Sequence, residues 1–71
     1  MESIHFEEVI TLGQFLKHEG IIGTGGEAKL FLAEYEVILN GVPEDRRGKK
    51  LQNGDEIDIG GFGHYRIVYP A

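Results

Sequence analysis

The chain has 71 residues, twelve acidic and seven basic side chains, a formal net charge of −5 and no cysteine. This length predicts one small domain with a thin core, and the missing cysteines exclude a disulfide framework, a thiolate metal site and a cysteine nucleophile. The acidic N-terminus lacks the apolar run of a signal peptide, and no segment approaches the roughly 20 apolar residues of a membrane span, so we expect a cytoplasmic protein that makes no membrane contact.

A first short helix is predicted to follow Thr11. Gln14 comes three residues after Thr11, which is the spacing of a capping box. Leu12 and Leu16 then recur at helical spacing, and Gly20 predicts the end of the helix after about two turns.

A second helix is predicted to begin in the same way at Thr24. Thr24 would cap this helix and Glu27 would reach back to the cap. Gly25 and Gly26 would then occupy the first helical turn, where they leave backbone N–H groups open. The apolar residues of this helix have the spacing of one buried stripe: Ala28, Phe31, Leu32 and Tyr35.

The remaining segments predict strands separated by turns. Strands are expected at residues 4–10 (an edge strand), 36–39, 56–59 and 64–69. The pair Asn40-Gly41 and the segment 53–55 are typical turn sequences. The fold class is therefore α+β, a single domain over residues 1–71 with two short helices packed on a small, mainly antiparallel β-sheet.

An ordered set of residues runs from residue 10 to residue 59. Its members are Leu12 and Leu16, then Ala28, then Val37-x-Leu39-Asn40-Gly41, and finally Gly54-Asp55 with Ile57. This order resembles the S-four type RNA-binding domain, or αL motif, and the chain is similar in size to its small stand-alone bacterial members. The resemblance implies that RNA binds across the helix pair and the loop that precedes the Gly-Asp turn.

Two positions depart from the family pattern. Many members carry Asp in the first helix, where this chain has Gly13. Many also carry Ser-Arg at the start of the second helix, where this chain has Thr24 and Gly25. The glycine removes a positive charge that the resemblance would assign to phosphate binding.

Four of the seven basic side chains lie within five positions: Arg46, Arg47, Lys49 and Lys50. One interpretation is a solvated loop whose charge is balanced by Glu44 and Asp45. The other is a phosphate clamp, in which Arg offers a planar fork, Lys a mobile charge, and Gly48 lets the loop follow a nucleic-acid backbone. The resemblance favours the clamp.

Further candidates for RNA contact lie on the helices. Lys17, Lys29 and, less strongly, His18 would extend the basic surface, or would serve only as solubilising charge. The segment Thr24-Gly25-Gly26 could bind an anion at a helix N-terminus, or could be no more than a tight loop. Three tyrosines could stack on bases or pack partly in the core, and we expect partial burial, at least of Tyr35.

We therefore predict a non-catalytic RNA-binding module for structured RNA, with ribosomal RNA and a ribonucleoprotein as expected partners. No cofactor, metal or small-molecule substrate is expected, because the three histidines are scattered and no nucleophile–base pair is visible. One alternative is a protein-interaction module that docks through its acidic face. Another is a β-grasp sulfur carrier, which would need a C-terminal Gly-Gly, whereas Gly60-Gly61 is internal.

Overall fold

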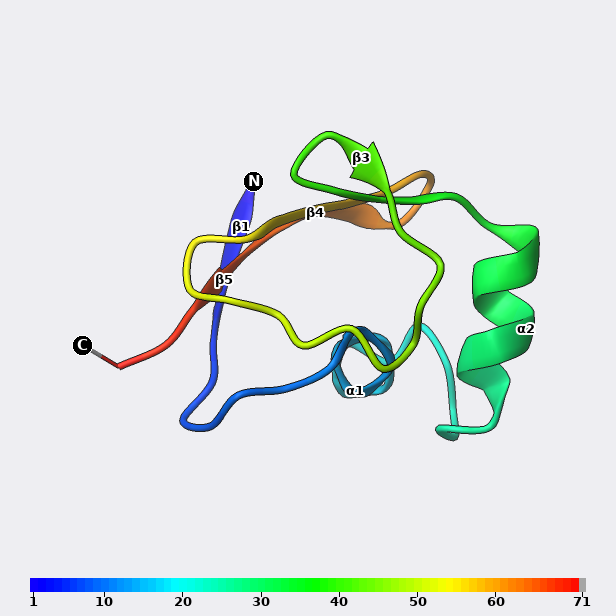
Figure 1. Ribbon diagram of the computed structural model, residues 1–71, viewed down its shortest axis with the longest axis horizontal. Coiled ribbons are helices and arrows are strands. Elements are labelled where there is room, and N and C mark those ends of the chain that lie inside the picture. Colours follow the sequence, from blue (N-terminus) through cyan, green and yellow to red (C-terminus); the bar gives the residue numbers. More distant parts are fainter. Residues whose placement is uncertain (71) are drawn as a thin grey trace.

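The structure is a computed structural model that describes residues 1–70. Its elements are β1 (Glu2–His5), α1 (Leu12–His18), α2 (Glu27–Glu34), β2 (Val37–Leu39), β3 (Val42–Pro43), β4 (Glu56–Ile59) and β5 (Gly63–Val68). Figure 1 shows the strands as one curved layer, with α1 seen end-on beneath it and α2 standing at the right. This arrangement confirms the predicted α+β fold. Among the described residues, neither helix has the length and apolar character needed to cross a membrane.

The five strands form one sheet in the order β1-β5-β4-β2-β3. β1 runs parallel to β5, and the other neighbours are antiparallel. The N-terminal edge strand is confirmed, although it covers residues 2–5 and not 4–10. The short strand β3 was not predicted, because two residues are too few to show an alternating pattern.

The two predicted turns contact each other through Asn40. Asn40 and Gly41 have positive φ angles of 52° and 82°, as a tight hairpin turn between β2 and β3 requires. The Asn40 side chain accepts a hydrogen bond from the Glu56 N–H (2.9 Å) and donates one to the Asp55 carboxylate (2.9 Å). The Asn-Gly and Gly-Asp pairs are therefore parts of one structural unit that fixes β2 against β4.

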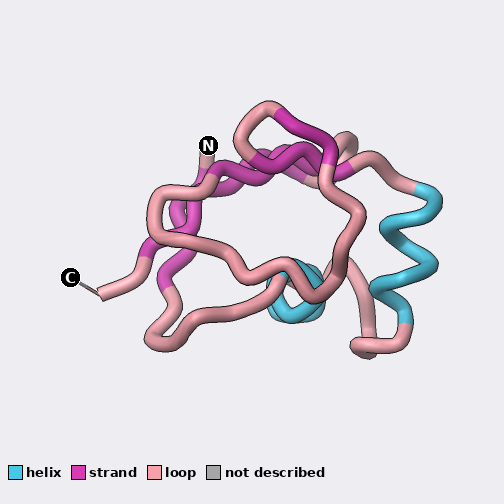
Figure 2. The backbone as a smooth tube through the Cα atoms, in the orientation of Figure 1, coloured by secondary structure: helices cyan, strands magenta, loops and turns pink. Residues whose placement is uncertain are grey.

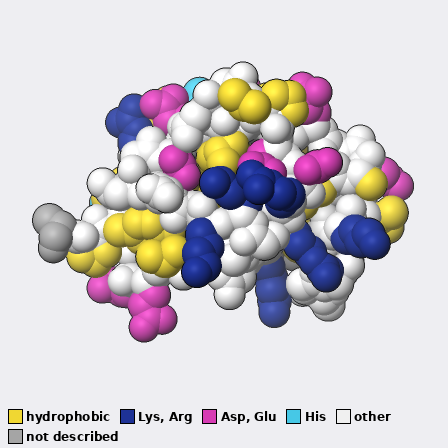
Figure 3. Space-filling view, in the orientation of Figure 1, with side chains coloured by type: hydrophobic (Ala, Val, Ile, Leu, Met, Phe, Trp, Pro, Cys, Tyr) yellow, Lys and Arg dark blue, Asp and Glu magenta, His cyan; other side chains and the backbone are white. Residues whose placement is uncertain are grey.

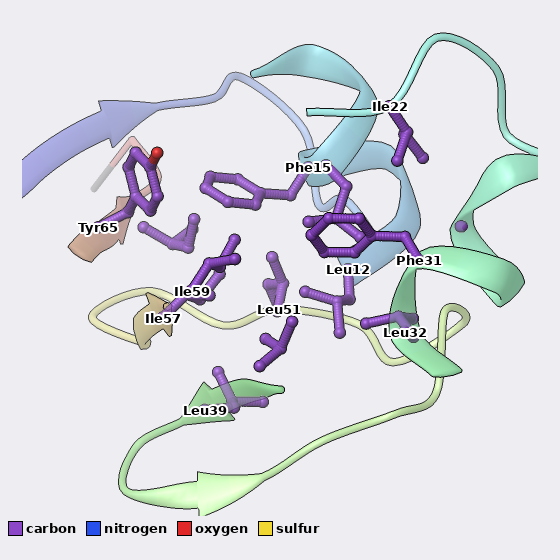
Figure 4. Packing of buried hydrophobic residues seen from close by; sticks show 14 residues of the cluster. Leu12, Phe15, Ile22, Phe31, Leu32, Leu39, Leu51, Ile57, Ile59 and Tyr65 are labelled. Carbon is purple, nitrogen blue, oxygen red and sulfur yellow. The ribbon is translucent and has the colours of Figure 1, made fainter. Parts of the chain in front are cut away.

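The core lies between the helices and one face of the sheet. It contains Leu12, Phe15, Leu16, Ile22, Ala28, Phe31, Leu32, Val37, Leu39, Leu51, Ile57, Ile59, Tyr65 and Ile67. Alternate residues of each central strand enter it, as the pleat requires. Figure 4 shows Leu51, which belongs to no helix or strand, among side chains from α1, α2 and β4. The segment between β3 and β4 is thus anchored in the core.

The start of the second helix differs from the prediction. The helix begins at Glu27, and its N-cap is Gly26, which makes no side-chain capping bond. Thr24 is therefore not the N-cap, and Gly25 and Gly26 form a turn before the helix. The carboxylate of Glu27 does reach back, to the Gly23 N–H (3.3 Å) and the Thr24 hydroxyl (3.5 Å). Two consecutive glycines favour a turn over the first helical turn because they lose the most backbone entropy in a helix.

Tyr35 also differs from the prediction, because it is 46% exposed and not part of the buried stripe. It is the C-cap residue of α2 and has an extended backbone conformation (φ −119°, ψ 136°). Helical spacing from Phe31 therefore no longer fixes its direction. The expectation of partial burial is met instead by Tyr69, which is half-buried, whereas Tyr65 is fully buried.

Candidate nucleic-acid interface

The four clustered cations lie on a segment that we call the basic loop, residues 44–51. Backbone hydrogen bonds attach this loop to the first turn of α1: the Leu12 N–H donates to the Lys49 carbonyl (2.8 Å) and the Gly13 N–H to the Arg47 carbonyl (2.9 Å). Both N–H groups belong to the helix start, where no intrahelical acceptor is available. Figure 2 shows the loop running beside α1. The helix thus gains caps, and the loop gains a fixed path.

Leu51 and Tyr69 hold the C-terminal end of the basic loop. The Leu51 side chain is 1% exposed, and its N–H donates to the Ile10 carbonyl (2.9 Å). The Tyr69 hydroxyl donates to the Leu51 carbonyl (2.9 Å) and accepts from the Ile10 N–H (3.1 Å). The Tyr69 hydroxyl therefore joins Leu51, at the end of the basic loop, to Ile10, which precedes α1. This is a structural role.

Gly13 permits the close approach of the basic loop to α1. It is buried, and a Cβ atom at this position would lie 3.2 Å from the Arg47 carbonyl oxygen and 3.4 Å from the Arg47 Cβ. The contact with the Arg47 carbonyl oxygen is tighter than an ordinary van der Waals separation, and the contact with the Arg47 Cβ is at the lower limit of one. The departure from Asp at this position therefore has a physical consequence: the loop lies directly on the helix.

A hollow of about 360 Å³ opens between α1, the turn before α2 and the basic loop. Lys17, Gly25 and Arg47 all line it. Three candidates from distant parts of the sequence are therefore brought together. Gly25 has open space around the position of a Cβ, so the absent family arginine would have pointed into a free region.

The other candidates surround this hollow or lie apart from it. Arg46, Lys50 and Lys29 are exposed and Lys49 is half-buried. Figure 3 shows Lys and Arg side chains gathered on one face, over the basic loop and the helices. Thr24 and Gly26 are exposed but do not line the hollow.

Arg46 is already paired within the loop. Its Nε donates to Glu44 Oε2 (2.9 Å) and its terminal nitrogen to Glu44 Oε1 (3.0 Å), a bidentate contact. This hydrogen bonding to Arg46 lowers the pKa of the Glu44 carboxyl from 4.5 to about 2, and the carboxylate raises the pKa of Arg46. Within residues 1–70, Arg47, Lys49 and Lys50 have no salt bridge. The balancing role expected of Glu44 thus applies to one of the four cations.

The histidines have local partners. His18 lies 3.0 Å from Glu19 Oε2 and packs edge-on against Phe6, with ring centroids 4.7 Å apart. His64 lies in β5, within the strand predicted at residues 64–69, and its Nε2 is 3.7 Å from Glu56 Oε1. Within residues 1–70, no group of three His, Asp or Glu side chains is placed to hold a metal ion.

The sequence analysis missed the residues that position the cations. Leu51 followed the charged run without any periodic pattern, and Tyr69 formed its contacts after the last strand ended. For Gly13, the departure from the family pattern was an available signal. The assembled surface offers guanidinium and ammonium groups on a rigid support. Such groups are better suited to binding phosphate oxygens than to catalysing a reaction.

Comparison with known proteins agrees with this geometry. The family model for the S4 domain matches residues 3–68, which include all of β5 and all of β1 except its first residue. The chain is also similar to the "Probable ribosome maturation protein RlbA" of Bacillus subtilis (strain 168), with 54% identity over 61 residues that cover 86% of each protein. The chain therefore belongs to the S4 domain family.

Proposed function

We propose that this protein is a non-catalytic module that grips the phosphates of structured RNA, with ribosomal RNA as its target during ribosome maturation. Membership of the S4 domain family supports RNA as the ligand, and the name of the Bacillus relative supports ribosome maturation as the process. The observation that carries the proposal is the position of Arg47 and Lys17 at one hollow, beside a loop that is hydrogen-bonded to α1.

The proposed contacts are electrostatic and would depend on the shape of the RNA more than on its base sequence. Arg47 and Lys17 would hold phosphates at the hollow, while Lys49, Lys50 and Lys29 extend the positive surface around it. Arg46 must first exchange its contact with Glu44. The aromatic side chains with room for base stacking lie away from these cations, so phosphate contacts would dominate. The acidic remainder of the chain would oppose non-specific attachment to other polyanions.

The sulfur-carrier alternative finds no support in the fold. Gly60 and Gly61 lie in the turn between β4 and β5, and Gly61 has a φ of 83° that the hairpin requires. This glycine pair therefore has a structural role in the hairpin.

A salt series with purified ribosomal RNA tests the proposal. With about four to six phosphate contacts, log K of the natural protein should fall against log salt with a slope of roughly −3 to −5. The variant with Arg46, Arg47, Lys49 and Lys50 all changed to Ala should lose both affinity and most of this slope.

A matched pair of single variants locates the effect. Arg47→Ala should weaken binding, whereas Arg66→Ala, which removes the same charge from β5 where Arg66 pairs with Glu56 (3.2 Å), should leave it nearly unchanged. An absence of binding at low salt, or equal losses in the two variants, would contradict the proposal.

A further inference from the structure

Three aromatic rings cluster on the surface away from the hollow of the basic surface. Tyr35 stacks on Phe31 with centroids 4.6 Å apart, and Phe62 from the β4–β5 turn meets both rings edge-on at 5.6 and 5.8 Å. Tyr35 is 46% and Phe62 47% exposed, and neighbouring Leu30 on α2 is 63% exposed. We call these four residues the aromatic patch.

The aromatic patch has the form of a binding site for an apolar side chain. It lines a hollow of about 260 Å³, together with Ile21 and Ile22. The rings hold one another in place, so an incoming side chain would order little that is not already ordered. Isolated apolar side chains on a surface are normal, but contiguous aromatic ones around a hollow mark interaction sites.

Carboxylates surround the aromatic patch. Glu27 and Glu34 line the same hollow, and Glu34, Glu36 and Asp45 line a second hollow on the other side of Tyr35. Within residues 1–70, none of these four carboxylates has a salt bridge. Figure 3 shows hydrophobic and acidic side chains at its right-hand edge, over α2, with one basic side chain beside them. This charge repels phosphate, so RNA is a poor occupant, and it attracts lysine and arginine.

We propose that the aromatic patch binds a basic protein segment, one rich in Lys and Arg that inserts a Leu or an aromatic side chain between Leu30, Tyr35 and Phe62. The apolar anchor would supply most of the affinity, and the carboxylates would set the orientation and the association rate. The aromatic patch and its carboxylates Glu27, Glu34 and Glu36 lie outside the basic loop and do not line the hollow beside α1; Asp45 alone belongs to both regions. The protein can therefore hold RNA on one surface and a basic partner segment on another.

A titration followed by NMR tests this proposal. The probe is a short synthetic peptide rich in Lys and Arg that carries two Leu residues one helical turn apart. Shift changes should concentrate at Leu30, Tyr35 and Phe62. Two control peptides, one with Ser in place of Leu and one with Glu in place of the basic residues, should each bind at least about tenfold more weakly.

Variants of the protein separate the patch from the rest of the surface. Tyr35→Ala should weaken peptide binding about tenfold or more, whereas Val42→Ala, at an apolar position on β3 that is more exposed than Tyr35 (63% against 46%), should not. The double change Glu34→Gln with Glu36→Gln should reduce binding and its salt dependence, unlike Glu7→Gln with Glu8→Gln. The Val42 and glutamate variants should keep the RNA affinity and the melting temperature of the natural protein, whereas Tyr35→Ala should keep the RNA affinity and lose some stability, because Tyr35 stacks on Phe31.

Several results would overturn the proposal. Equal binding of the Ser-containing peptide would mean general charge attraction without an apolar site. Competition of RNA with the peptide, with RNA shifts at Tyr35 and Phe62, would make the patch part of the RNA surface. Sedimentation that shows self-association abolished by Tyr35→Ala would make a second copy of the chain the occupant. An absence of peptide binding at low salt would remove the site altogether.

Discussion

The bidentate contact of Arg46 with Glu44 makes the cations of the basic loop unequal. A phosphate that binds Arg46 must compete with a carboxylate that already offers two acceptors at 2.9 and 3.0 Å. Arg47 has no such partner within residues 1–70 and lines the hollow directly. Arg46 and Arg47 are therefore not equally available to a ligand, although they are adjacent in the sequence. The contact with Glu44 reduces the positive charge that the loop offers.

Glu44→Gln should release Arg46 and increase RNA affinity. The slope of log K against log salt should become steeper by about one, because one more cation contacts phosphate. Asp45→Asn is the matched control, since it removes an adjacent negative charge that has no salt bridge within residues 1–70. The same gain in both variants would show that only the net charge matters and that the contact between Arg46 and Glu44 does not hold Arg46 back.

The lowered pKa of Glu44 also predicts a dependence of stability on pH. Because its folded-state pKa is about 2 against an ordinary 4.5, the charged form stabilises the folded protein. This contribution is complete above pH 4.5 and is lost as the pH falls toward 2. Carboxyl carbon NMR should show Glu44 titrating with a midpoint of about 2, and Arg46→Ala should return its midpoint close to 4.5. An unchanged midpoint in that variant would assign the shift to another cause.

At the scale of elements, the basic loop and α1 form one unit because the start of a helix needs acceptors. The carbonyls of Lys49 and Arg47 supply them, and Thr11 supplies a third through its side chain to the Gln14 N–H (3.2 Å). The loop therefore behaves as an extension of the helix cap. Changes in its backbone position should alter both the helix and the charged surface.

Gly13→Ala tests this coupling. Alanine usually stabilises a helix by up to about 1 kcal/mol relative to glycine, but here its Cβ would lie 3.2 Å from the Arg47 carbonyl, and the loop is held on both sides. We expect faster hydrogen exchange at the amides of positions 12 and 13, and weaker RNA binding. Gly60→Ala is the control, since a Cβ there meets nothing within 4 Å and Gly60 lies outside the basic loop and its hollow. Unaltered exchange at both amides would mean that the loop can move away at no cost.

Much of the element pattern could be predicted because it depends on local chemistry. The capping box of Thr11 and Gln14, the Asn40-Gly41 turn and the alternation of Ile57 and Ile59 all form within a few residues. Thr24 failed as a cap because a glycine pair follows it. The position of the cations depends on contacts across the fold, such as Leu51 with the core, and those leave no local pattern.

At the scale of the whole molecule, the terminal strands support the proposed RNA surface without contributing residues to it. β1 and β5 lie beside each other in the sheet, and Ile67 of β5 is fully buried in the core. A domain of 71 residues has a total stability of roughly 4–11 kcal/mol, so a single core residue is a substantial part of it. A variant can therefore lose RNA binding because its binding site has changed or because the protein unfolds. An experiment has to distinguish these two causes.

The variant Ile67→Ala should show how a loss of folding differs from a loss of the binding site. Removal of this side chain costs about 2–5 kcal/mol, so part of the population is expected to unfold at room temperature. The apparent RNA affinity should fall only by the fraction unfolded, and the slope of log K against log salt should stay that of the natural protein, because each folded molecule keeps its phosphate contacts. Ile67→Val, which costs about 0.5–1.5 kcal/mol, should bind almost normally. A reduced slope in Ile67→Ala at temperatures where circular dichroism shows it folded would mean that the sheet sets the position of the basic loop as well as its stability.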